Sequence, residues 1–352
     1  MRYAMPHKSF LLVVLMLGGC QDFTFPVPPV DPSPPLAKQI GIPPPGSYYH
    51  GVYPGQKNLE EYQVTPAALD AYTEAVGRKV AWVYFSNDWF ASRAFPKATA
   101  EWIRAKGAVP YIRLMLRSSS ETYVTEPLYS LEAILRGDFD ADLRAWGQAA
   151  KAFGTPVLVE WGTEANGQWF SWNGKWNGGS VLGPKRFRDT YRHIVQTIRS
   201  SGADNLTWVW HVDAYDDPAT EWNRLENYYP GDDVVDWIGV SVYGAQEPTE
   251  NNPQTFADGM NAVMLRLAQL APTKPVVVAE FGVTAGNPGV SAVKWAEAAL
   301  AEILSNRWPQ VRGFAWWNEA FDQTEMRVQA IPGLKEVFRQ KLASPQIVDH
   351  PL

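Results

Sequence analysis

Two glutamates stand where short β-rich runs give way to loops, and their residue type suggests acid/base and nucleophilic chemistry. Glu164 closely follows the run 156–161 and precedes a loop rich in aromatic residues, whereas Glu280 ends the apolar run 275–280. Two carboxyl groups about 5 to 5.5 Å apart can cleave a glycosidic bond with retention, because one attacks the anomeric carbon and the other protonates the leaving oxygen. We expect an ionised Glu280 to raise the pKa of Glu164, so that Glu164 stays protonated as a general acid.

The elements that must position these glutamates alternate along the chain. β-rich runs are followed by segments with helical apolar spacing, such as 139–153 and 187–198, and no Gly-rich phosphate loop follows the first run. This pattern favours an α/β fold, a single (β/α)8 TIM barrel, over an open doubly wound sheet, and it puts both glutamates at the carboxyl ends of strands. The predicted strands are 50–53, 80–85, 108–115, 156–161, 206–211, 234–242, 275–280 and 311–317.

Several short motifs surround the two glutamates. They are EANGQWFSW at 164–172, YPGD at 229–232, VDWIGVSVY at 235–243 and AEFG at 279–282. Together they resemble glycoside hydrolase family 26, over about residues 48–338. That family is best known for β-mannanases, and some members act on mixed-linked β-glucan or β-1,3-xylan. The resemblance implies a clan A barrel and a retaining endo-β-glycanase that needs no cofactor.

The resemblance also implies roles for individual residues in this chain. Glu164 would be the acid/base and Glu280 the nucleophile. Trp169 would be a stacking platform beside the scissile bond, and Tyr243 would hydrogen-bond the nucleophile. Asn166 would shape the loop that carries the acid.

The end of the last predicted strand contains a further aromatic candidate. It also contains one of the two positions at which this chain differs from the family pattern. Trp316 or Trp317 would form the floor under the sugar that is cleaved, and we favour Trp317. The family usually has His before the acid, where this chain has Thr163, and mannanases often have Arg where this chain has Asn318. The second departure weakens mannan as the substrate more than it weakens glycosidase as the class.

Other polar and aromatic residues near strand ends are candidates to contact sugar. Arg113 and His211 could line the pocket floor, although polar residues of a barrel core fit the same positions. Asp88 and Trp89 could contact a more distant sugar or only pack their loop. Trp172 belongs to the aromatic loop after the acid. Four further acidic residues, Glu160, Glu319, Asp213 and Asp216, could be buried partners, rim residues or pocket residues.

The N-terminus predicts export and a membrane anchor. Residues 1–19 read as a signal peptide, with basic residues before a short apolar run, and LGGC at 17–20 resembles the lipobox of bacterial lipoproteins. Cys20 is the only cysteine, so we expect it to carry the lipid. The Pro-rich segment 20–46 would be a spacer, and the catalytic domain would cover 47–345. The predicted location is the bacterial cell envelope, at the outer surface or facing the periplasm.

Composition narrows the partners. A formal net charge of −6 argues against nucleic acid, and the chain's 16 Trp, 15 Tyr and 15 Phe suit a sugar-binding cleft. The five histidines show no paired ligand spacing, so we expect no metal. We expect a monomer acting on a β-linked polysaccharide, with β-mannan first. A non-catalytic glycan-binding lipoprotein and an enzyme for the cell's own exported polysaccharide are the alternatives.

Overall fold

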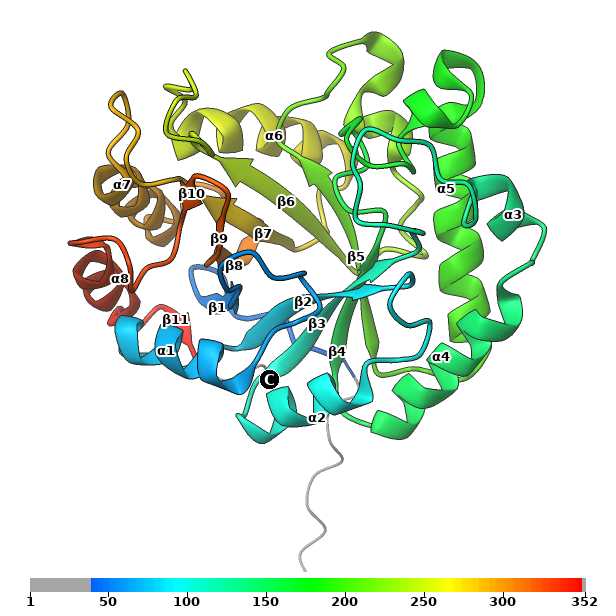
Figure 1. Cartoon of the computed structure of the whole chain (residues 1–352), viewed down its shortest axis with the longest axis horizontal. Coiled ribbons are helices and arrows are strands. Elements are labelled where there is room, and N and C mark those ends of the chain that lie inside the picture. The colour runs from blue at the N-terminus through cyan, green and yellow to red at the C-terminus, as the bar shows by residue number, and fades with distance from the viewer. Residues whose placement is uncertain (1–38, 350–352) are drawn as a thin grey trace, which may run out of the picture. The chain divides into compact units, whose positions relative to one another are not determined.

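The computed structural model describes residues 39–349, and these form the predicted (β/α)8 barrel (Figure 1). Eight parallel strands pair in chain order, and the last pairs back with the first to close the barrel. All eight predicted strands are present, with bounds shifted by a few residues. They are β1 Tyr48–Tyr53, β2 Trp82–Asp88, β3 Val109–Met115, β4 Val157–Trp161, β5 Leu206–Asp213, β6 Trp237–Tyr243, β7 Val276–Gly282 and β8 Val311–Trp317.

The helices surround the strands, each burying one face against them (Figure 1). Local sequence signals start them: Thr65 caps α1 ahead of Pro66, and Thr255 and Asp258 form a capping box on α6. Within residues 39–349, no helix is long and apolar enough to cross a membrane. The helices are α1 Pro66–Val76, α2 Lys97–Ala105, α3 Leu131–Leu135, α4 Asp140–Phe153, α5 Gly179–Arg199, α6 Phe256–Leu270, α7 Ala292–Leu304 and α8 Leu334–Leu342.

Short elements complete the domain. The 3₁₀ turns η1 Gly174–Trp176, η2 Glu221–Asn223 and η3 Leu225–Tyr228 lie in the loops after β4 and β5. Strands β9 Ala320–Phe321 and β10 Thr324–Glu325 form a small antiparallel pair after β8.

Two segments outside 47–345 also pack on the barrel. Strand β11, Ile347–Val348, pairs with β1, and the buried Ile40 donates its backbone N–H to Thr207. The predicted signal peptide and Cys20 lie outside the described residues.

A tryptophan fills part of the barrel interior and requires glycine on two neighbouring strands. Trp82 is fully buried. A Cβ on Gly51 would lie 2.0 Å from Trp82 Nε1, and a Cβ on Gly313 would lie 2.4 Å from Trp82 Cη2. Gly51 lies on β1 and Gly313 on β8, and these two strands pair to close the barrel, so the indole lies at the closure.

Gly51→Ala is therefore expected to destabilise the barrel. The methyl group cannot fit unless Trp82 or the backbone of β1 moves, and such overpacking costs about 3 kcal/mol. Urea unfolding followed by tryptophan fluorescence measures the loss. Gly289→Ala is the matched control, since its added Cβ meets nothing closer than 3.4 Å. Equal stability of the two variants would contradict this account of the closure.

Candidate active site

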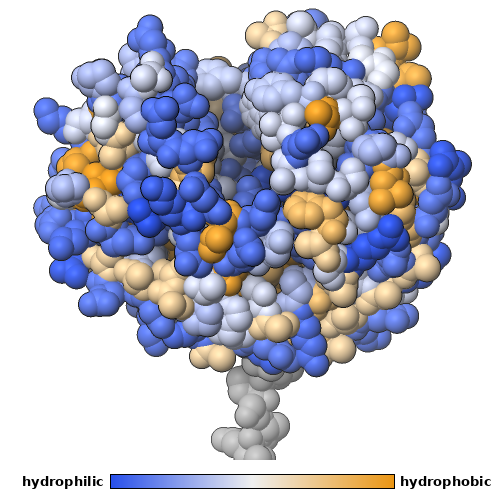
Figure 2. Space-filling view, viewed as in Figure 1, coloured by the Kyte–Doolittle hydropathy of each residue, from blue (hydrophilic) through white to orange (hydrophobic). Residues whose placement is uncertain are grey.

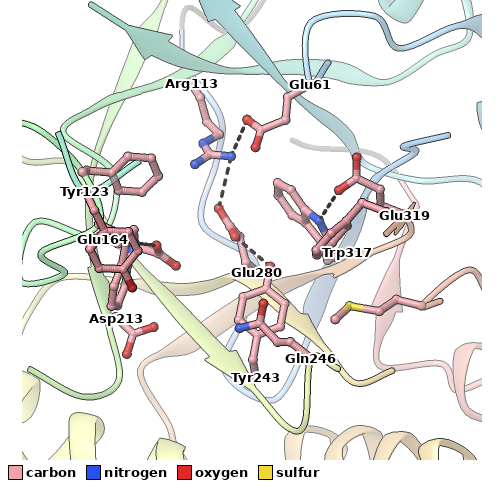
Figure 3. Close-up of a pocket in the computed structure, with 14 residues that line it drawn as sticks. Glu61, Arg113, Tyr123, Glu164, Asp213, Tyr243, Gln246, Glu280, Trp317 and Glu319 are labelled. Atoms are coloured by element: carbon pink, nitrogen blue, oxygen red, sulfur yellow. Dashed lines mark hydrogen bonds and ion pairs between the residues drawn. The ribbon is translucent and has the colours of Figure 1, made fainter. Parts of the chain in front are cut away.

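Glu280 owes its position to an irregularity in strand β7. The pairing of β6 with β7 runs Val240 with Val278 and then Ser241 with Glu280, so Ala279 is an extra residue in β7. An extra residue of this kind bends a strand and re-aims the side chain that follows. Figure 3 shows the Glu280 carboxylate pointing into the pocket.

The Glu280 carboxylate is nearly buried and surrounded by polar partners. Tyr243 donates to its Oε2 at 2.8 Å, Tyr84 lies 3.1 Å from its Oε1, and Arg113 Nη1 lies 3.8 Å from Oε1. The Tyr243 contact is the one that the resemblance implied. Burial raises the pKa of Glu280 to about 7, with Arg113 opposing the shift and the charge of Glu164 adding to it.

Glu164 lies on a sharp turn after β4. Gly162 has φ +73° and leaves room for Phe187, because a Cβ there would meet the Phe187 ring at 2.5 Å. Glu164 itself has φ +49°, a left-handed conformation that is uncommon for a residue with a side chain and often marks a functional site. Trp169 Nε1 donates to Glu164 Oε2 at 2.6 Å and so fixes the orientation of the carboxylate.

Asn166 ties the acid loop to the loop after β5. Its Nδ2 donates to the Asp213 carbonyl at 3.0 Å and to Asp216 Oδ1 at 2.9 Å, and its Oδ1 accepts from the Asp213 amide at 2.8 Å. Asn166 is fully buried, so it shapes the loop rather than lining the pocket. The Asp213 side chain lines the pocket, where burial and the charge of Glu164 raise its pKa well above the usual range.

Glu160 forms an ionic cluster in the barrel below the pocket. Its carboxylate accepts from Tyr111 at 2.7 Å and lies 3.1 Å from His211 Nδ1 and 3.8 Å from Arg113 Nε. Thr163, where the family usually has His, also donates to Glu160. Burial opposes ionisation, yet His211 and Arg113 lower the pKa of Glu160 to about 2. Glu160 is thus an ionised core residue and cannot compete with Glu164 as a proton donor.

Trp317 and Trp316 lie on opposite sides of β8, because side chains alternate along a strand. Trp317 lines the pocket, packs on Tyr53 with ring centroids 4.1 Å apart, and donates to Glu319 Oε2 at 2.9 Å. Trp316 is fully buried and donates to the Met326 carbonyl at 2.7 Å. Of the two, only Trp317 faces the pocket.

Four further candidates are buried away from the pocket. Asp88 is paired with Arg117 at 2.7 Å, and Trp89 packs edge-on against Tyr129 at 5.4 Å. Trp172 is 2% exposed and donates to the backbone of the acid loop, and His211 is fully buried in the core cluster. These side chains support the loops and the barrel core instead of facing the pocket.

Asn318 is likewise buried and does not reach the pocket lining. Its Oδ1 accepts from the Val328 amide at 2.8 Å, which braces the segment after β8. The residue at this position therefore has a structural contact in this chain.

The two glutamates share one open pocket of about 520 Å³ (Figure 3). The space-filling view shows this face of the molecule hollowed into a deep cleft (Figure 2). Among the predicted residues, the lining includes Glu164, Glu280, Trp169, Tyr243, Trp317 and Arg113. Across residues 39–349, no cluster of His, Cys, Asp and Glu is arranged to hold a metal ion.

Several lining residues were not among the predicted site residues. Glu61, from the loop after β1, pairs with Arg113 at 2.6 Å. Burial raises the pKa of Glu61, but the charges of Arg113 and Arg117 outweigh this effect and lower it. Burial and the charge of Glu61 raise the pKa of Glu319 to about 8. Apart from Phe170, which lies in the motif at 164–172, no motif marked these residues, because tertiary folding alone brings their loops together. The lining residues that were not predicted are Glu61, Tyr123, Phe170, Gln246, Phe321 and Met326, whereas Glu319 and Asp213 were among the acidic candidates.

Known proteins resemble this chain in sequence and fold. Residues 131–343 match the model of Glycosyl hydrolase family 26. Endoglucanase H of Acetivibrio thermocellus is 25% identical over 286 residues, 80% of this chain and 29% of that protein. A β-1,3-xylanase of a Vibrio species is 25% identical over 247 residues, 62% of this chain and 50% of that protein. The fold matches a modular endo-β-1,4-mannanase from Cellulomonas fimi with TM-score 0.64 and 21% identity, covering 87% of this chain and 72% of that one.

These matches differ in what they support. The chain spans at most half the length of these two sequence relatives, and the likeness to the Cellulomonas fimi structure is one of fold. The family match covers more than half of the chain and includes both glutamates and the motifs around them. By this match, the chain belongs to glycosyl hydrolase family 26.

Proposed function

We propose that this protein is a retaining endo-β-glycanase in which Glu280 is the nucleophile and Glu164 the acid/base. The observation that carries the proposal is the placement of both carboxyl groups in one open pocket, at the carboxyl ends of β4 and β7. Catalytic groups of TIM barrels come from this end of the strands. Figure 2 shows an open cleft on this face of the molecule, and an open cleft suits cleavage within a chain.

The reaction takes two steps. In the first, a Glu280 oxygen bonds to the anomeric carbon while the bond to the leaving oxygen breaks and Glu164 gives that oxygen its proton. In the second, Glu164 takes a proton from water, whose oxygen attacks the anomeric carbon and releases Glu280. Two displacements restore the original configuration at that carbon.

The surroundings of each glutamate support these roles. Arg113, with Nη1 3.8 Å from Glu280, stabilises the ionised form that a nucleophile needs, and Tyr243 holds the carboxylate in one orientation. Trp169 binds one oxygen of Glu164, which leaves the other to exchange a proton with the leaving group or water. The two carboxyl groups thus have different neighbours suited to different tasks.

β-Mannan is the substrate that we propose first, with mixed-linked β-glucan and β-1,3-xylan as alternatives. The mannanase fold neighbour favours the first, and the endoglucanase and β-1,3-xylanase relatives favour the others. We also propose that the chain is a monomer tethered to the cell envelope through a lipid on Cys20. The lipobox-like LGGC and the apolar run before it support the tether.

A substrate panel tests this function. The full-length chain is incubated with β-1,4-mannan, mixed-linked β-glucan, β-1,3-xylan and cellulose, and reducing ends are measured together with solution viscosity. We expect one substrate to lose viscosity early, because internal cuts shorten chains faster than they release small sugars. ¹H NMR of the first products should show the β-anomer. Binding without any new reducing ends would favour the non-catalytic glycan-binding alternative, and an initial α-product would contradict retention.

A further inference from the structure

An exposed tyrosine stands at the rim of the pocket on the loop between β3 and α3. Tyr123 is 55% exposed and lines the pocket. Its φ is +59°, a left-handed conformation that is unfavourable for an aromatic residue. Its ring takes part in no aromatic pair among residues 39–349. The free protein therefore keeps Tyr123 in an unfavourable backbone conformation with its ring half-exposed and in no aromatic pair, which indicates a functional constraint.

The loop that carries Tyr123 is built to hold it there. The carboxylate of Glu126 accepts four hydrogen bonds, from the amide of Ser118 at 2.8 Å and its hydroxyl at 3.1 Å, and from the amides of Leu128 and Tyr129 at 2.8 and 3.0 Å. A carboxylate bound in this way closes the loop on itself. Glu126 thus holds together the two ends of the segment that carries Tyr123.

A second contact joins Tyr123 to the acid. Its backbone N–H donates to the Trp169 carbonyl at 2.8 Å, and the Trp169 indole donates to Glu164 at 2.6 Å. Figure 3 shows Tyr123 on the Glu164 side of the pocket, with Trp317 and Glu319 on the other side of Glu280. The acid must lie beside the leaving oxygen, so residues on its side face the part of the chain that leaves.

We propose that the Tyr123 ring is a platform for the leaving part of the polysaccharide, stacking on a pyranose beyond the one that Trp169 contacts. This rests on the proposed function and deepens it. A pyranose presents a face of C–H groups that packs on an aromatic ring, and the Tyr123 hydroxyl can bond a sugar hydroxyl at the edge. Glu126 is a positioning residue for this platform.

Three variants of the full-length chain test the platform. Tyr123→Gly removes the ring and suits the left-handed backbone, Tyr123→Phe keeps the ring, and Leu128→Ala is a control at another exposed apolar residue of the same loop. Each is assayed with the hexasaccharide of the preferred polysaccharide and with the matching β-disaccharyl fluoride. The fluoride leaving group is too small to reach Tyr123.

We expect Tyr123→Gly to lose about tenfold or more in kcat/KM on the hexasaccharide. The same variant should stay within about twofold of wild type on the fluoride, and its resistance to urea should be unchanged or higher because the strain is relieved. Tyr123→Phe and Leu128→Ala should stay close to wild type on both substrates. Equal activity of Tyr123→Gly and wild type on the hexasaccharide would overturn the platform, as would an equal loss on both substrates.

A failure of the proposed function gives a different result. If the wild-type chain hydrolyses neither substrate, the catalytic proposal fails, and the platform is then read by calorimetric titration with β-1,4-mannohexaose, cellohexaose and β-1,3-xylohexaose. Weaker binding in Tyr123→Gly than in Leu128→Ala supports a sugar platform. Equal affinity of the two variants for these sugars, or no binding by either or by wild type, overturns it.

Discussion

Glu280→Ala is expected to abolish turnover of the polysaccharide, with kcat falling by about 10⁴-fold or more, because the substitution removes the group that forms the proposed covalent intermediate. The shorter side chain leaves a space beside Tyr243 and Arg113, whose donors then face the anomeric carbon. Added azide can enter this space and attack in place of the carboxylate. With a β-glycosyl fluoride as substrate, one displacement gives the α-glycosyl azide, which NMR identifies.

The control separates chemistry from folding. Glu101→Ala removes an exposed glutamate of α2 and should leave both activity and unfolding unchanged. Circular dichroism and urea unfolding of Glu280→Ala should show a folded barrel. Retained activity in Glu280→Ala, or a β-glycosyl azide from it, would remove Glu280 from the nucleophile role.

The pH profile provides a second measure of the same residue. Burial raises the pKa of Glu280 to about 7, so the carboxyl group binds a proton below that pH. The nucleophile must be ionised, and kcat/KM should therefore fall as the pH decreases through about 7, since this parameter reports groups of the free enzyme. An acid limb near the ordinary pKa of glutamic acid would show that Arg113 and the tyrosines compensate burial fully.

The strand positions could be predicted because each strand is buried on both faces and reads as a nearly continuous apolar run. The resemblance favoured Trp317 over Trp316, and the alternation of side chains along a strand explains why only one of these neighbours faces the pocket. The barrel rule then placed Glu164 and Glu280 at one end of the fold. The pattern of apolar residues was thus enough to predict the fold and the end of the barrel at which the two carboxylates lie.

The rest of the site depends on contacts that the periodic pattern of apolar residues does not predict. Ala279 is the extra residue in β7, but nothing in the sequence marks it, because an alanine after a run of valines is ordinary in a strand. Glu61 reaches Arg113 from 52 residues away along the chain, and Tyr123 reaches the pocket through a loop closed by Glu126. Such contacts are set by loop geometry, which local propensities describe poorly.

The aromatic and acidic candidates show the same limit. Asp88 ends β2 and Trp89 follows it, yet Asp88 pairs with Arg117 and Trp89 packs against Tyr129. Trp172 lies in the acid loop but packs beneath it, with its ring stacked on Phe170 at 4.5 Å. Residue type and strand end together are therefore not enough to assign a sugar contact.

Glu164→Ala is expected to show a loss that depends on the leaving group. The sugar of a polysaccharide leaves poorly without a proton, so kcat/KM on it should fall by about 10³- to 10⁴-fold. Fluoride leaves with little protonation, so the first step with a β-glycosyl fluoride should remain fast while hydrolysis of the intermediate becomes slow. A burst of fluoride, equal to the enzyme concentration, should then precede a slow steady state.

The configuration of the azide product distinguishes Glu164→Ala from Glu280→Ala. Removal of Glu164 opens space on the side of the sugar opposite Glu280, so azide attacks the glycosyl intermediate from there and gives the β-glycosyl azide after two displacements. Trp169→Phe is the matched probe of orientation: it removes the indole N–H that binds Glu164 but keeps a stacking ring. Its kcat/KM on the polysaccharide should fall less than that of Glu164→Ala, and the first step with the fluoride should again be the less affected. If Glu164→Ala slows the fluoride and the polysaccharide equally and gives no burst, Glu164 does not act as the acid/base, whatever the role of Glu280.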